Sequence, residues 1–216
     1  MDLTSPRTIR NIQEQFGFTF KKGLGQNFLT ARNILEEIVD AAEIESGVIE
    51  VGPGFGVLTS ELAQNSDKVV TIEIDERLID VLDYTLAEYD NVKIINEDIL
   101  KLDLKKVIDD EFNGEKVSIA ANLPYYITTP IITKLLEEKL PIKNIVVMVQ
   151  KEVAERMSAK PSTKNYGAIT VLCQYYTEQS IVANVPASLF VPPPKVDSAV
   201  LELKVLDKPS VEVKDE

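Results

Sequence analysis

The sequence predicts an α/β fold in which a mostly parallel β-sheet carries helices on both faces. Two observations support this prediction. Short β-branched and apolar runs alternate along the chain with segments of helical periodicity, which is the pattern of repeated strand–helix–strand units. The strand-like runs are also nearly all apolar, as is typical of parallel strands that are buried on both sides.

The elements follow one another regularly. Five runs have the composition of strands: Val48–Val51, Val69–Ile74, Val92–Ile95, Val117–Ala121 and Ile145–Val149. Four segments have helical spacing: Val57–Ala63, Arg77–Leu86, Pro130–Leu136 and Glu152–Met157. Because each helix lies between two strands or follows the last of them, we expect the strands to run parallel in one sheet.

The C-terminal third adds one helix and a closing pair of strands. Apolar residues fall at i, i+3, i+4 and i+7 at four positions: Ile169, Leu172, Cys173 and Tyr176. On that helical face Cys173 is predicted to be a core residue and not a nucleophile. Ile181–Val185 and Ser198–Val205 are predicted to pair as strands, and the prolines at 192–194 predict a stiff, extended connection between them.

Composition excludes several classes of site. The chain has 216 residues, of which 44% are hydrophobic and 27% charged, as in a globular protein of one or two domains. There is no histidine, so histidine triads and histidine–metal sites are excluded, and we expect no metal. The single cysteine excludes an internal disulfide and suits a reducing compartment. With neither a long apolar run nor a signal sequence at the N-terminus, the expectation is a cytoplasmic protein without a membrane partner.

The charge is uneven. The net charge is −12, which counts against nucleic acid as a partner, but residues 1–34 carry five basic and two acidic side chains, a net +3. This basic N-terminal arm, residues 1–20 in our division of the chain, is either a solvated segment or a phosphate contact.

A glycine turn marks a candidate cofactor site. Gly52, Gly54 and Gly56 lie between a predicted strand and a predicted helix, where glycine permits positive φ and close approach of a ligand. The spacing is G-x-G-x-G, which is neither the dinucleotide fingerprint nor a P-loop, and such a turn also occurs for geometry alone.

Two acidic residues make the site more specific. Glu73 ends the next strand, 21 residues after Gly52, where an acid is placed to accept hydrogen bonds from ribose hydroxyls. Asp98 follows the third strand and is placed to accept from an exocyclic amine of a purine, although a turn aspartate would look the same. A ribose acid without phosphate-binding chemistry favours a nucleoside-like cofactor such as S-adenosylmethionine.

The fourth strand leads into Asn122-Leu123-Pro124-Tyr125. Pro124 fixes its own φ and biases Leu123 toward an extended conformation, so the segment would present the Asn122 amide and a main-chain carbonyl rigidly at the edge of the sheet. Two acceptors and an aromatic ring suit the exocyclic amine of a flat base, although a structural turn with buried tyrosines is the alternative.

Asn122–Tyr125 resembles the N-[IL]-P-[YF] motif of the rRNA adenine N6-methyltransferase family. Three more segments resemble the same family, at residues 25–29, 50–54 and 192–198, and the likeness extends over about residues 21–205. It is most similar to the bacterial family members that dimethylate N6 of two adjacent adenosines in the 3′-terminal hairpin loop of 16S rRNA. The resemblance implies a Rossmann-like domain with a seven-stranded sheet over residues 21–205 and a polar tail at 206–216. The family's C-terminal helical domain is expected to be absent.

The resemblance also implies roles for particular residues. The cofactor S-adenosyl-L-methionine would be bound by ten residues: Gln26, Asn27, Leu29, Gly52, Gly54, Glu73, Ile74, Asp98, Ile99 and Asn122. The catalytic set would be Asn122, Leu123, Pro124, Tyr125 and Phe190, with Tyr125 and Phe190 on either side of a flipped adenine. Without the resemblance, Phe190 would be predicted to be a core residue.

The implied partner is 16S rRNA within the 30S subunit, bound by a monomer with a role in small-subunit biogenesis. Phosphate contacts are expected from the basic N-terminal arm and from six further cations: Lys134, Lys151, Arg156, Lys160, Lys164 and Lys195. Three alternatives stay open: a 23S rRNA methyltransferase of the erythromycin-resistance type, a ribosome-assembly factor that mainly binds, and a DNA or small-molecule N-methyltransferase.

Overall fold

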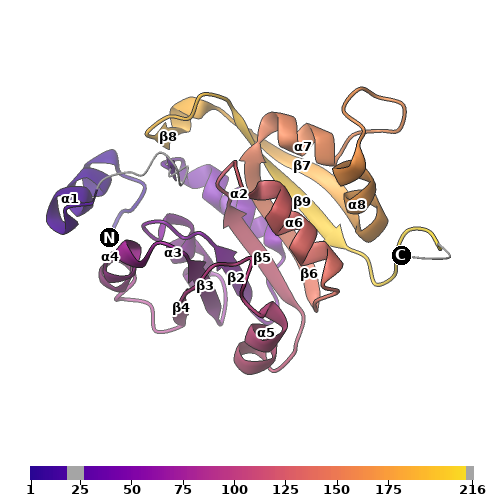
Figure 1. Cartoon of the computed structure of the whole chain (residues 1–216). Helices are drawn as coiled ribbons and strands as arrows, with labels where there is room; N and C mark the ends of the chain where they lie inside the picture. Colours follow the sequence, from indigo (N-terminus) through magenta and orange to yellow (C-terminus); the bar gives the residue numbers. More distant parts are fainter. Residues whose placement is uncertain (19–26, 213–216) are drawn as a thin grey trace.

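The computed structural model describes residues 1–18 and 27–212. Strands and helices alternate through most of the chain (Figure 1). The strands are β1 (Phe28–Leu29), β2 (Val48–Val51), β3 (Val69–Glu73), β4 (Val92–Asn96), β5 (Val117–Asn122), β6 (Ile142–Gln150), β7 (Thr177–Val185), β8 (Phe190–Val191) and β9 (Ser198–Val205). The α-helices are α1 (Pro6–Phe16), α2 (Arg32–Ala42), α3 (Val57–Gln64), α4 (Ile79–Thr85), α5 (Leu104–Phe112), α6 (Thr128–Glu137), α7 (Lys151–Met157) and α8 (Ala168–Tyr176). Two 3-10 turns are η2 (Glu76–Leu78) and η3 (Ala187–Leu189).

Seven strands form the main sheet in the order β4-β3-β2-β5-β6-β9-β7. The first five run parallel, and β9 is antiparallel to both of its neighbours, β6 and β7. The predicted mostly parallel sheet is therefore confirmed, together with the closing strand pair. From β2 the chain adds β3 and β4 on one side, and β5 and β6 on the other. The switch point therefore lies between β2 and β5, and open α/β sheets bind ligands at such a point.

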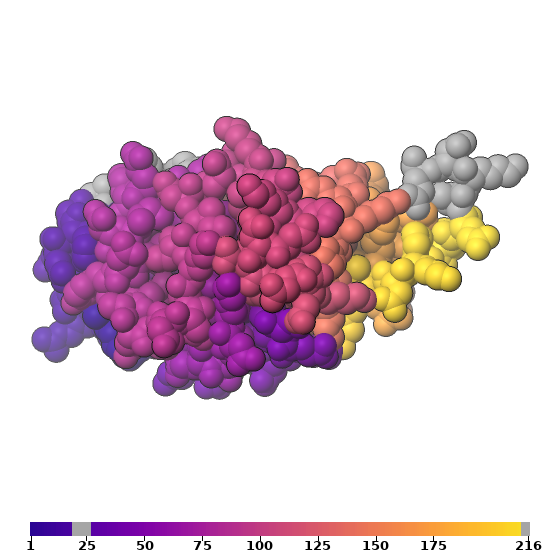
Figure 2. Space-filling view, turned by 90° about the horizontal axis from the view of Figure 1, so that it is seen from below, coloured from indigo at the N-terminus to yellow at the C-terminus, as the bar shows by residue number. Residues whose placement is uncertain are grey.

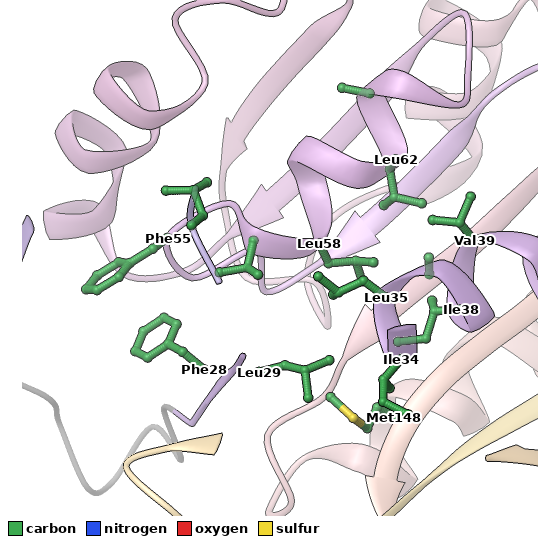
Figure 3. Close-up of a cluster of buried hydrophobic side chains, with 14 of the residues drawn as sticks. Phe28, Leu29, Ile34, Leu35, Ile38, Val39, Phe55, Leu58, Leu62 and Met148 are labelled. Atoms are coloured by element: carbon green, nitrogen blue, oxygen red, sulfur yellow. The ribbon is translucent and has the colours of Figure 1, made fainter. Parts of the chain in front are cut away.

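Helices cover both faces of the sheet because residues alternate in direction along each strand. On β6, Val146 and Met148 pack with α1–α4, whereas Ile145 and Val147 pack with α5–α8. Figure 3 shows part of the first cluster, in which Leu35 and Ile38 of α2 face Leu58 of α3. The second cluster contains Cys173, which is fully buried, so the prediction of a core residue is confirmed.

Three helices were not predicted from the sequence. The first, α1, contains the basic Arg7 and Arg10, but Ile9 and Ile12 on its other face are buried in the first cluster. Much of the N-terminal arm is therefore a packed helix at one end of the molecule, and β9 ends near the other end (Figure 2). The two remaining unpredicted helices, α2 and α5, supply core residues on opposite faces of the sheet. Within the described ranges, no helix is long and apolar enough to cross a membrane.

Candidate active site

Four neighbouring parallel strands deliver polar groups to one edge of the sheet. Gly52 directly follows β2, Glu73 ends β3, Asp98 follows β4, and Asn122 ends β5. All four line one cavity, which contains about 1030 Å³ of space including its open mouth. The further predicted residues that line it are Asn27, Leu29, Gly54, Ile74, Ile99 and Pro124. Gln26 lies outside the described residues.

The glycine turn has the conformation that its sequence predicts. Gly52, Gly54 and Gly56 have φ values of 71°, 59° and 83°, in the left-handed region that disfavours residues with a Cβ. A Cβ on Gly54 would lie 2.7 Å from Cε1 of Phe28, whereas a Cβ on Gly52 would meet no atom within 4 Å. The backbone at Gly52 is therefore open to the cavity, and the absence of a side chain at Gly54 lets the Phe28 ring pack against the turn.

Glu73 is buried, with 5% of its surface exposed, so it is not a solvated surface residue. Its Oε1 accepts a hydrogen bond from the amide of Asp75 at 2.8 Å, and its Oε2 accepts one from the amide of Gly54 at 3.4 Å. Burial is the main cause that raises the pKa of Glu73, opposed by these backbone donors. The carboxylate thus ties the end of β3 to the glycine turn while it faces the cavity.

Asp98 forms a turn and also lines the cavity, so both interpretations considered from the sequence stay open. Its Oδ1 accepts from the amide of Leu100 at 3.0 Å, so it does form a turn. The residue also lines the cavity, with Oδ2 3.7 Å from Nζ of the largely exposed Lys101. Nearby, Ile99 is buried and Ile74 is 53% exposed, so two apolar side chains flank a polar edge.

The residues of the predicted catalytic tetrapeptide differ in their exposure to the cavity. Asn122 and Pro124 line the cavity, whereas Leu123 is 1% exposed and its amide donates to the carbonyl of Met148 at 3.1 Å. The Pro124 carbonyl accepts from the amide of Ile127 at 3.1 Å and from Oγ1 of Thr128 at 3.3 Å. Among the described residues, no hydrogen bond to the Leu123 carbonyl is found, so this carbonyl is the better candidate for the main-chain acceptor.

The predicted aromatic pair lies beside the cavity and does not line it. The Tyr125 hydroxyl lies 2.9 Å from Oγ of Ser198, and burial raises the pKa of this tyrosine. Phe190 is 3% exposed and pairs with Leu29 between β8 and β1. The structure instead places Tyr126 in the cavity lining, with 58% of its surface exposed.

Sequence reasoning missed several other lining residues, of which Glu50 is the most informative. It lies in the middle of apolar β2 and is 1% exposed. Its Oε2 accepts from Oγ1 of Thr59 at 2.5 Å and from Oγ1 of Thr71 at 3.3 Å. Burial raises the pKa of Glu50 to about 8. The available signal was an acid within a strand of otherwise apolar residues.

A parallel sheet with a glycine turn and acceptors at the next strand ends is the arrangement of an S-adenosylmethionine-dependent methyltransferase. The ribosomal RNA adenine dimethylase family model matches residues 17–216. The chain belongs to this ribosomal RNA adenine dimethylase family, and it is an S-adenosylmethionine-dependent methyltransferase whose substrate is ribosomal RNA.

Individual relatives agree with the family model. The chain is 55% identical to the ribosomal RNA small subunit methyltransferase A of Bacillus mycoides (strain KBAB4), over 100% of this chain and 75% of the relative. A solved dimethyladenosine transferase from Plasmodium falciparum is 35% identical, with a TM-score of 0.73 over 83% of this chain and 64% of that one. The 23S rRNA methyltransferase ErmE is 31% identical, with a TM-score of 0.70 over 86% of this chain and 72% of that one.

Proposed function

We propose that the protein dimethylates N6 of two adjacent adenosines in the 3′-terminal hairpin loop of 16S rRNA, within the 30S subunit. The observation that supports this most directly is the single cavity that joins Asn122 to Glu73 and Asp98, in a chain 55% identical to small-subunit methyltransferases. We also propose that it acts in the cytoplasm as a monomer during small-subunit biogenesis, and that residues 21–205 form its methyltransferase domain.

The cavity lining fits S-adenosylmethionine. Glu73 would accept from the ribose hydroxyls, and Asp98 from the adenine amine, with Ile74 and Ile99 against the ring. Gly52 leaves open backbone for the methionine end, beside Asn27 and Leu29. When bound, the cofactor supplies a methyl group on a sulfonium that is already an activated leaving group.

The tetrapeptide would act on the target amine. The adenine N6 is a poor nucleophile because its lone pair conjugates with the ring. Hydrogen bonds from N6–H to Oδ1 of Asn122 and to the Leu123 carbonyl would favour a more tetrahedral nitrogen, and these bonds stabilise the transition state more than the ground state. The tetrapeptide and cofactor site would bring N6 into line with the methyl carbon. No side chain is assigned as a general base, and the proton leaves to water after attack.

An exposed tyrosine in the cavity lining supports capture of an unstacked base. Extrusion of a base costs a few kcal/mol, and less from a loop. Stacking on an aromatic side chain contributes about 1–3 kcal/mol per base. The exposed ring of Tyr126 adds a candidate stacking surface to the proposed pair of Tyr125 and Phe190. The second methylation would depend more on stacking, because a monomethylated amine has lost one N–H.

Exposed cations on α7 and on two neighbouring loops support an RNA partner despite the acidic total. Five of the predicted basic residues are exposed and form no ion pair within residues 1–18 and 27–212: Lys151, Arg156, Lys160, Lys164 and Lys195. We name these five the basic cluster. They lie on α7, on the loop that follows it and on the loop before β9, and the amide of Lys151 donates to the carbonyl of Asp197. Lys134 differs, because it is 14% exposed and paired with Glu138.

Methyl transfer to ribosomal particles tests the proposal. Radiolabelled S-adenosylmethionine is incubated with the protein and with unmethylated 30S or 50S particles, and the modified nucleoside is identified. We expect label in 30S particles as N6,N6-dimethyladenosine at two adjacent positions. Label confined to 50S particles would contradict the proposal and favour the second candidate, a 23S rRNA methyltransferase, which the likeness to ErmE keeps in view.

A further inference from the structure

The side-chain amide of Asn122 is anchored at one end only. Its Nδ2 donates to the main-chain carbonyl of Asn27 at 3.1 Å. Oδ1 lies at the other end of the planar amide, and among the described residues no donor to it is found. Asn122 lines the cavity, and its Oδ1 is not fully buried although it has no hydrogen-bond partner among the described residues. This oxygen is therefore open to a ligand.

Asn27 itself is held by the strand that follows it. Leu29 of β1 pairs with Phe190 of β8, away from the main sheet. The next residue, Thr30, donates to the carbonyl of Leu189 from both its amide, at 2.9 Å, and its Oγ1, at 2.8 Å. The register of β1, and with it the position of the Asn27 carbonyl, therefore depends on this double hydrogen bond.

Aromatic packing also holds the same strand. The ring of Phe28 stacks on that of Phe55, with 4.2 Å between ring centroids and 18° between planes. The two rings face each other in Figure 3. Phe28 also crosses Gly54 in the glycine turn. Strand β1 is thus clamped by its pairing with β8 and by the contact of Phe28 with the glycine turn.

We propose that the main-chain carbonyl of Asn27 is a positioning group that sets the orientation of the catalytic amide. An amide could present either end to the target. A carbonyl can only accept, so it holds Nδ2 and leaves Oδ1 for the N6–H of adenine. In the reversed amide, Oδ1 would face the Asn27 carbonyl, which is also an acceptor, and Nδ2 would face the N6–H of adenine, which is also a donor. This inference rests on the proposed function, and assigns a role that the tetrapeptide alone does not contain.

Replacement of Asn122 by aspartate should make the activity depend on pH, because only the protonated carboxyl can make both hydrogen bonds of the asparagine amide. An ionised carboxylate would face the Asn27 carbonyl with an acceptor, whereas a neutral carboxyl can donate to that carbonyl and still accept from the amine. The titratable groups around the cavity are Glu50, Glu73, Glu97, Asp98 and Tyr126, and no cationic side chain among the described residues lines it. The carbonyl and these acids favour the neutral form of the new carboxyl, whereas the positive sulfonium of a bound cofactor favours the ionised form.

The experiment measures kcat of Asn122→Asp and Asn122→Ala relative to the wild type, on 30S particles from about pH 6 to about pH 8.5. We expect both variants to be about 10²–10³-fold slower at the alkaline end. The relative activity of Asn122→Asp then rises, by up to about tenfold per pH unit, as the pH falls toward the pKa of the new carboxyl. That of Asn122→Ala stays flat. Parallel profiles for the two variants would overturn the proposal.

A second pair of variants tests the clamp. Thr30→Val removes one of the two hydrogen bonds to Leu189, and Thr30→Ser retains it. Added to Asn122→Asp, Thr30→Val is expected to move the rising limb to lower pH, because the carbonyl is no longer held against the carboxyl, whereas Thr30→Ser leaves it in place. An unmoved limb in the Thr30→Val combination contradicts the role of the clamp. Loss of the proposed function would be distinguishable, because the wild type would then label no 30S particles.

Discussion

Oε2 of Glu73 accepts a hydrogen bond from the amide of Gly54 at 3.4 Å, and this contact joins the end of β3 to the glycine turn after β2. The proposed ribose acceptor is therefore also a brace for the turn on which the methionine end would lie. Binding of cofactor should depend on Glu73 through both roles.

We expect Glu73→Gln to raise the Kd for S-adenosylmethionine by about 10–100-fold, because hydrogen bonds to a charged acceptor contribute about 1.5–3 kcal/mol. Isothermal titration calorimetry measures the change. Glu76→Gln, at an exposed position three residues later, is the matched control and should bind as the wild type does. Equal affinities for the two variants would show that Glu73 does not contact the ribose.

Gly54→Ala should weaken cofactor binding at least tenfold and destabilise the fold. The added Cβ would lie 2.7 Å from Phe28, whose ring is already stacked on Phe55, and the φ of 59° adds roughly 1–2 kcal/mol of strain. Gly114→Ala is the control, since its φ is 73° but its nearest neighbour is Oδ1 of Asp109 at 3.3 Å. Denaturant unfolding should show a smaller loss for the control, with binding unchanged. Equal losses would mean that Phe28 moves aside freely.

Tyr125 and Tyr126 are both candidates to stack on the target base. Tyr125→Phe keeps the ring and loses only the hydrogen bond to Ser198, so its kcat/KM should stay within about threefold of the wild type. Tyr125→Ala and Tyr126→Ala should each lower kcat/KM by about 10–100-fold if both rings contact the base. Steady-state methylation of 30S particles measures kcat/KM for the three variants. Full activity of Tyr125→Ala on both methylation steps would remove Tyr125 from the site.

We expect the free energy of unfolding to fall as the pH rises, because of the buried acid Glu50. Its pKa is about 8 in the folded protein against 4.5 for an unperturbed glutamate, so between these values the folded state binds the proton more tightly. The contribution favouring the folded state is complete below about pH 4.5 and is lost progressively as the pH approaches 8. Glu50→Gln should therefore unfold at higher denaturant concentration than the wild type at pH 8, with a smaller advantage at pH 5. A constant difference across this range would contradict the raised pKa.

RNA binding should depend steeply on salt. Each phosphate contact contributes a slope of about −0.7 to −0.9 to log K against log salt, so Lys164→Ala in the basic cluster should reduce the slope by about one such step. Lys105→Ala, on α5, is the control, because its Nζ is already paired with Asp109 at 2.9 Å. Filter binding of 30S particles across a salt series measures both. An affinity that does not change with salt would refute the assignment of phosphate contacts.

Most strands and helices of the main sheet, and the polar residues at the strand ends, could be predicted from the sequence alone, whereas α1, α2 and α5 could not. These features are local: period-2 and period-3.6 patterns report burial directly, and Gly52, Glu73, Asp98 and Asn122 each follow or end an apolar run. Parallel strands in adjacent positions then bring those ends together without any further information.

The neighbours of these residues depend on contacts between segments that are far apart in the sequence. Asn27 and Asn122 are 95 residues apart, so no local pattern predicts that the carbonyl of one holds the amide of the other. In the same way, the burial of one face of α1 depends on how the helices pack on the sheet. So does the presence of Tyr126, and not Tyr125, in the cavity lining. Such contacts arise because packing optimises burial over the whole core at once, and it is this packing that turns a list of candidate residues into a site.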